Sequence, residues 1–195
     1  MTNRAIRPAP AAPLQHTEQE GYFLDLRFDE MTADILAHPL FQDLKNHCHH
    51  GKENTLYDHS LSTAYCAYRL ALRFHLPEER VRAVTRAALL HDFFLYDWRS
   101  EAHRRYMQQF KGWHRLVRMH AFTHGALAAR RAGRRFELDE RQRAAITCHM
   151  FPLAPMPKSA EGWILTLADK MVASREVSAS LACKMRRLYP RHSAA

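Results

Sequence analysis

The sequence of 195 residues lacks the features of several large protein classes. Its four cysteines contain no C-x-x-C pair. We therefore expect neither a disulfide framework nor a zinc ribbon, and a reducing cytoplasm is the expected location. No apolar run approaches the roughly 18 residues of a transmembrane helix, and no hydrophobic segment near the start suggests a signal peptide. We accordingly expect no contact with a membrane.

The sequence also has no alternating strand-like runs, no internal repeats and no glycine-rich phosphate loop. P-loop and dinucleotide-binding folds are therefore not expected. With 47% hydrophobic and 25% charged residues, the composition is that of an ordinary globular protein. We predict a single all-α domain, a helical bundle over residues 18–195, after a disordered Pro/Ala leader at 1–17.

Capping signals and prolines give the expected helices. Thr55 with Asp58, and Asp139 with Gln142, resemble capping boxes at two helix starts. Further starts are indicated by Pro77 and by Thr123. The expected segments are short helices broken at Pro39 over 18–45, then 56–75, 77–91, a basic region 101–118, 124–132, 140–150, a segment from 159, and a separate helix over 176–188.

Positive charge is concentrated in one part of the chain. Between residues 99 and 143 there are 12 Lys and Arg against four Asp and Glu, an excess of eight within a formal net charge of +9. Such a region attracts anions, whether nucleotides or nucleic acid. Its interleaved aromatic residues also fit single-stranded nucleic acid, although a solvated helix surface explains the same composition.

Five polar residues interrupt apolar patterns where helices should bury themselves, and a sixth lies at an expected helix start. The five are His59, His91, Asp92, His149 and Asp169, and the sixth is His124. A buried, unpaired carboxylate is costly, so such a group is usually neutralised, paired or bound to metal. A core histidine with hydrogen-bond partners is the simpler explanation of each residue alone. Together, four imidazoles and two carboxylates suit a pair of divalent transition metals.

The order of these residues resembles a known family. His59, then His91-Asp92 after Ala-Ala-Leu-Leu, then Asp169 after Leu-Ala, resembles the H…HD…D signature of the HD superfamily of metal-dependent phosphohydrolases. His124 in Thr-His-Gly and His149 in Cys-His-Met resemble the two extra histidines of its binuclear members. The resemblance covers roughly residues 46–175.

The resemblance implies a metal centre with assigned ligands. His59, His91, Asp92 and Asp169 would hold a first ion, and His124 and His149, with Asp92 as a bridge, a second. The ions would be divalent, Fe or Mn first and Zn, Ni or Mg next. A hydroxide shared by the ions would attack a small phosphorylated substrate, a nucleotide or another compact phosphate compound.

Further residues complete the expected site. Asp92 and Lys170 are assigned to catalysis, and Lys52, His50 and Arg99 to substrate binding. The cyclic-dinucleotide branch is not favoured, because Leu95 stands where that branch has a lysine. Three alternatives stay open: a diadenosine-tetraphosphate-type hydrolase, a di-iron oxygenase on the same fold, and a non-catalytic basic module that binds nucleic acid through 99–143. The sequence leaves the oligomeric state undetermined.

Overall fold

The computed structural model describes residues 16–47, 55–95 and 100–188, and every structural statement refers to these ranges. Within them the chain is helical and contains no β-strand, so the all-α prediction is confirmed. The elements are α1 His16–Leu36, α2 Pro39–Gln42, the 3-10 helix η1 Asp43–Asn46, α3 Leu56–Arg73, α4 Glu78–Leu90, α5 Glu101–Gln108, α6 Gly112–Leu116, α7 His120–Ala132, α8 Glu140–Cys148 and α9 Ala160–Leu188. Nearly all of the leader predicted at 1–17 lies outside the described residues.

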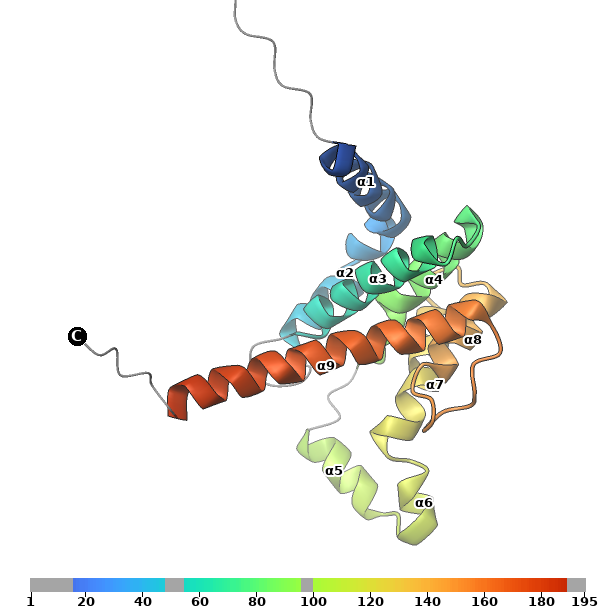
Figure 1. Ribbon diagram of the computed structural model, residues 1–195. Coiled ribbons are helices and arrows are strands. Elements are labelled where there is room, and N and C mark those ends of the chain that lie inside the picture. The colour runs from blue at the N-terminus through green and yellow to red at the C-terminus, as the bar shows by residue number, and fades with distance from the viewer. Residues whose placement is uncertain (1–15, 48–54, 96–99, 189–195) are drawn as a thin grey trace, which may run out of the picture.

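Helix α4 forms the centre of the bundle. Every residue from 83 to 90 is buried, which is the pattern of a helix surrounded by other elements. It packs against α1, α3, α7, α8 and α9. Helix α3 carries Ala64, Ala67 and Ala71 in the core, and such small side chains let neighbouring helices approach closely. Figure 1 shows α3 and α9 side by side, and the packing of the two helices agrees with this view.

Two capping boxes and one break are present as predicted. Thr55 accepts a hydrogen bond from the backbone of Asp58 and opens α3, and Asp139 does the same with Gln142 at the start of α8. Helix α1 ends at Leu36, and Pro39 occupies the first turn of α2. These signals act through two or three neighbouring residues, so the sequence alone was sufficient to find them.

Two predicted boundaries are wrong. Helix α7 begins at His120, so Thr123 lies inside the helix, where its hydroxyl donates to the carbonyl of Met119. The two helices expected after residue 159 are one continuous helix, α9. No proline or glycine interrupts the sequence between 163 and 188, so the helix has no local reason to end.

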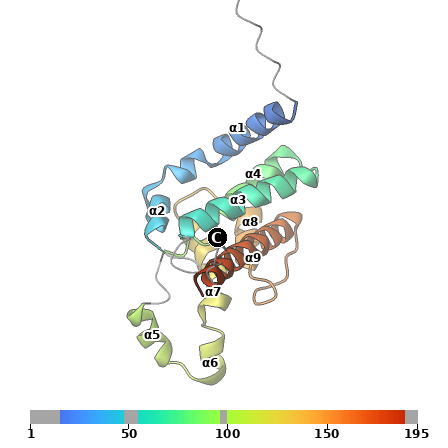
Figure 2. The same ribbon diagram turned by 60° about the vertical axis from the view of Figure 1, so that its left-hand side comes forward.

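Helices α5 and α6 form an arm outside the bundle, which we call the α5–α6 arm (residues 101–116). Figures 1 and 2 show these two helices set apart from α3, α4 and α9, with α6 leading back to α7. The turn between them passes through Gly112, whose φ of +53° lies in the region that favours glycine. Among the described residues, no helix has the length and apolarity needed to cross a membrane.

Candidate metal centre

The six polar residues predicted to bind metal lie together inside the bundle. His59 comes from α3, His91 and Asp92 follow α4, His124 is on α7, His149 follows α8 and Asp169 is on α9. Each is at most 9% exposed. Lys170 is exposed and lines the pocket beside them. His50, Lys52 and Arg99 lie outside the described residues, and their assignment stays a prediction.

Two of the histidines are positioned by the same local device. His91 and His149 are the first residues after α4 and α8, and each Nδ1 donates to a carbonyl three residues back, Ala88 and Ile146, at 2.7 Å. The last carbonyls of a helix have no helical partner, and the C-terminal end carries partial negative charge. Both helix ends therefore orient an imidazole and favour a cation nearby.

His124 is brought to this point by a close approach of α7 to α8. Its Nδ1 donates to the carbonyl of His120 at 2.8 Å. The next residue is Gly125, where an added Cβ would stand 2.9 Å from the carbonyl oxygen of Ile146. A glycine at this position therefore allows the helices to meet closely. The result is a distance of 3.0 Å between Nε2 of His124 and Nε2 of His149.

His59 is held by a residue that the sequence analysis missed. Its Nδ1 lies 3.2 Å from both carboxylate oxygens of Glu176 on α9, while its Nε2 lies 3.1 Å from Oδ1 of Asp169. Glu176 and Asp169 are seven residues apart, two helical turns, and so share one face of α9. Reading α9 as continuous would have revealed this spacing. Glu176 therefore orients His59 from behind.

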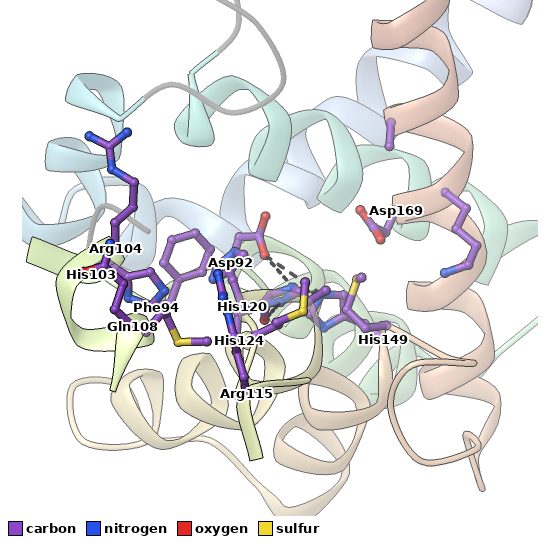
Figure 3. A pocket seen from close by; sticks show the side chains of 16 residues that line it. Asp92, Phe94, His103, Arg104, Gln108, Arg115, His120, His124, His149 and Asp169 are labelled. Atoms are coloured by element: carbon purple, nitrogen blue, oxygen red, sulfur yellow. Dashed lines mark hydrogen bonds and ion pairs between the residues drawn. The ribbon is translucent and has the colours of Figure 1, made fainter. Parts of the chain in front are cut away.

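The carboxylate of Asp92 lies between the two halves of the cluster. Its Oδ2 is 3.6 Å from Nε2 of His91, and its Oδ1 is 3.5 Å from Nε2 of His124 and 3.9 Å from Nε2 of His149. Asp169 Oδ1 is 3.6 Å from Nε2 of His91. In Figure 3, Asp92 lies near the centre of the view with His120 and His124, and Asp169 and His149 lie to its right. A bridging position for Asp92 agrees with this geometry.

The electrostatics of the cluster keep both aspartates ionised. Burial alone would raise the pKa of Asp92. The imidazoles of His91 and His124 lower it by more than burial raises it, so the net pKa is well below the usual value. Burial also raises the pKa of Asp169, but its interactions with His59 and His91 lower it well below the usual value.

Burial and the neighbouring His91 together lower the pKa of His149 to about 4. Although burial opposes it, the hydrogen bonds from His59 to Asp169 and Glu176 raise the pKa of His59 to about 10, and the charge of Asp92 raises the pKa of His91. The centre therefore holds ionised carboxylates beside two imidazoles that retain a proton and one that is neutral, and a bound cation would replace those protons.

The donor atoms fit a metal ion. Nδ1 of His91, His124 and His149 each carries its proton toward a carbonyl, so in the neutral rings Nε2 has a free lone pair. Nε2 of His124 and Nε2 of His149 lie at a hydrogen-bond distance of 3.0 Å, which two neutral rings of this tautomer could not satisfy, and Nε2 of His91 makes no hydrogen bond. Repulsion between lone pairs is relieved by a proton or a cation placed between them.

Two groups of three residues could each hold a metal ion, because the donor atoms within each group all lie within 4.8 Å of one another. One group is His59, His91 and Asp169, and the other is His91, Asp92 and His149. Imidazole suits Fe, Zn, Ni and Cu, and added carboxylates favour Mn, Mg or Fe. The cluster can therefore hold divalent metal.

Comparison with known proteins gives one match. The family model of the HD domain matches residues 56–174, more than half of the chain and the whole segment from His59 to Asp169. No curated protein and no solved structure matches the chain.

Proposed function

The chain belongs to the HD-domain family, and on this premise we propose that it is a metal-dependent phosphohydrolase that cleaves a phosphate ester or anhydride, with nucleotides as the first class to test. The family indicates metal-dependent hydrolase activity. One observation carries the proposal further: Nε2 of His124 and Nε2 of His149 face each other at 3.0 Å beside an ionised carboxylate. This arrangement suits a bound cation better than a closed core.

We assign the ligands in two sets. His59, His91, Asp92 and Asp169 would hold a first divalent ion, and His124, His149 and the shared Asp92 a second. The distances from Asp92 to His91 and His124, 3.6 and 3.5 Å, support a shared carboxylate. Fe and Mn are the expected metals because the set mixes imidazoles with carboxylates.

The chain's own residues supply orientation and charge. When bound, the two ions would lower the pKa of a water molecule and neutralise charge on the phosphoryl oxygens. Asp92, kept ionised by the surrounding imidazoles, would fix the spacing of the two ligand sets. Lys170 lines the pocket next to Asp169, where its ammonium would donate to a phosphate oxygen. Glu176 would hold the ring of His59 in place.

Hydrolysis assays on protein reconstituted with Mn²⁺ or Fe²⁺ test this proposal. The panel contains p-nitrophenyl phosphate, bis-p-nitrophenyl phosphate, ADP and diadenosine tetraphosphate. We expect turnover of at least one compound, and a loss of about 10²–10³-fold or more in Asp92→Ala. Asp29→Ala, which removes an exposed carboxylate on α1, is the matched control and should keep full activity.

Two outcomes would contradict the proposal. One is the absence of hydrolysis of all four compounds with either metal. The other is an equal rate in wild type and Asp92→Ala. A strong preference for diadenosine tetraphosphate would instead select that hydrolase type within the family.

A further inference from the structure

The cavity in front of the metal centre is larger than a phosphate group requires. Its volume is about 720 Å³, and Asp92, His124, His149 and Asp169 occupy only part of its wall. One water molecule takes about 30 Å³ in the liquid, so a phosphate of five heavy atoms fills a small fraction of this space. A cavity of this volume is in the usual range for an organic ligand. Figure 3 shows the remaining walls around the labelled site residues.

Much of the rest of the wall is apolar. It contains Phe94, Met107, Met119 and Met150. Met107 is the only buried residue of α5, although this helix stands outside the bundle. Methionine side chains are flexible and polarizable, and they adapt well to the surface of an apolar or aromatic ligand. The wall therefore suits an organic body rather than water alone.

Two arginines of the α5–α6 arm, Arg104 and Arg115, line this cavity, and neither forms an ion pair with a described carboxylate. In Figure 3 the side chain of Arg104 extends away from Asp92 and His124. In Figure 3 the side chain of Arg115 extends from α6 in the direction of His120 and His124.

Other arginines of the same segment are engaged elsewhere. Arg105 pairs with Glu101 at 2.5 Å, and the guanidinium of Arg118 lies 4.5 Å from the ring centroid of Phe110. The segment thus separates arginines that have local partners from arginines that line the cavity.

We propose that the α5–α6 arm, together with Phe94 and Met119 on the same cavity, determines the substrate specificity of this site. Arg115, with Arg104 at the rim, binds a second anionic group of the substrate, and Met119 with Phe94 packs against its apolar or aromatic body. The inference rests on the proposed function, because the reacting phosphate is placed at the metal centre. The substrate class is therefore an organic compound with a second anionic group next to the reacting phosphate.

Calorimetric binding to the metal-loaded full-length chain tests the arm separately from catalysis. The probes are the non-hydrolysable phosphonate analogues of AMP, ADP and pyrophosphate, named below by their parent compounds, which differ in their phosphate number and in the presence of the ring system. The variants are Arg115→Gln, Met119→Gln and, as the matched control, Arg105→Gln. A hydrogen bond to a charged group changes affinity by about tenfold or more.

We expect the Arg115 and Met119 variants to lose affinity for different probes. Arg115→Gln should weaken ADP and pyrophosphate by about tenfold and AMP by clearly less. Met119→Gln should weaken ADP severalfold and leave pyrophosphate unchanged. Arg105→Gln should match wild type for all three probes. In steady-state assays, Arg115→Gln and Met119→Gln should raise KM far more than they lower kcat.

The contradicting results are distinct from a failure of the proposed function. The inference is overturned if Arg115→Gln and Met119→Gln bind all probes as Arg105→Gln does, or if no probe binds below about 1 mM. It is also overturned if a single-stranded oligonucleotide binds through Arg115 more tightly than ADP, since the arm would then serve nucleic acid. If the probes bind in a manner that depends on Arg115 and Met119 but no compound is hydrolysed, the proposed hydrolase function is contradicted, while the inference that these residues bind a ligand stands.

Discussion

Helix α4 and the residues that follow it carry charged groups in two different settings. At its start and middle, Arg80 pairs with Glu161 at 2.6 and 2.9 Å, and Arg86 pairs with Asp34 at 2.6 and 2.8 Å. At its end, His91 lies 3.6 Å from Asp92 and its Nε2 makes no hydrogen bond. In each ion pair the guanidinium makes two short hydrogen bonds to the carboxylate, and no metal ion is needed to satisfy either group. At the centre, Nε2 of His91 instead faces the carboxylates of Asp92 and Asp169 at 3.6 Å, a separation at which a cation could bind all three groups.

The comparison teaches that the two settings should respond to different changes. Removing one partner of an ion pair costs stability whether metal is present or not, because it leaves the other charge without its partner. Removing a ligand of the centre should instead remove the stabilisation that metal provides. Metal-linked stability therefore separates the two regions experimentally.

The largest expected effect is on metal-linked stability in Asp92→Asn. A metal at 1,000 times its Kd stabilises the folded protein by about 4 kcal/mol. We expect wild type to gain this amount on addition of Mn²⁺, because the metal binds only the folded centre. Asp92→Asn should gain little, because it loses the carboxylate shared by both ligand sets. Thermal unfolding with and without Mn²⁺ measures the difference, and equal gains in both proteins would contradict the assignment.

A smaller effect is expected at Glu176, which contacts His59 rather than the proposed ions. Loss of such a supporting carboxylate weakens metal binding by about 10–100-fold. Glu176→Ala should show this loss in a Mn²⁺ titration. Glu176→Gln should recover part of it, because the amide oxygen can still accept a hydrogen bond from Nδ1 of His59. If the alanine variant binds Mn²⁺ as wild type does, Glu176 has no orienting role.

A comparable but metal-independent effect is expected at Glu161. Its side chain is 1% exposed and that of Arg80 is 35% exposed, so part of the interaction is screened by solvent. We expect Glu161→Gln to lower the free energy of unfolding by about 1–2 kcal/mol, equally with and without Mn²⁺. Glu79→Gln is the matched control, since Glu79 is 87% exposed and lies 3.9 Å from Arg141. A metal-dependent loss in Glu161→Gln would remove the distinction between the two regions.

The smallest effect is the pH dependence of that ion pair. The hydrogen bond from Arg80 lowers the pKa of Glu161 to about 2 from an ordinary value of 4.5. A lowered folded-state pKa gives stability that is present above pH 4.5 and lost as the pH falls toward 2. The stability gap between wild type and Glu161→Gln should therefore be constant from pH 5 to 7 and decrease between pH 4.5 and 3. Chemical denaturation at these pH values measures it, and a gap that grows on acidification would be the wrong sign.

The sequence predicted the parts of this molecule that depend on short-range signals. The two capping boxes, at Thr55 and Asp139, involve residues three positions apart. Five of the six residues of the centre were found because each interrupts an apolar helix face, and His124 was found at an expected helix start. The structure brings the six together, while their role as metal ligands remains our proposal.

The parts that were missed depend on contacts across the fold. Glu176 lay in a helix that was read as separate from Asp169, so the two-turn spacing of the carboxylates was hidden. Thr123 looked like a helix cap, although α7 begins a turn earlier at His120. The division of the basic segment into arginines that line the cavity and arginines with local partners follows from the position of α5 and α6, which no pattern of charges specifies.

Elemental analysis of the protein purified without chelator tests the central claim most directly. The comparison is between wild type, Asp92→Ala and the control Asp29→Ala. We predict about two equivalents of Fe or Mn per chain in wild type and in Asp29→Ala, and a loss of this metal in Asp92→Ala. The absence of any bound transition metal in wild type, with none taken up on reconstitution, would contradict the assignment of the buried histidines and aspartates as a metal centre.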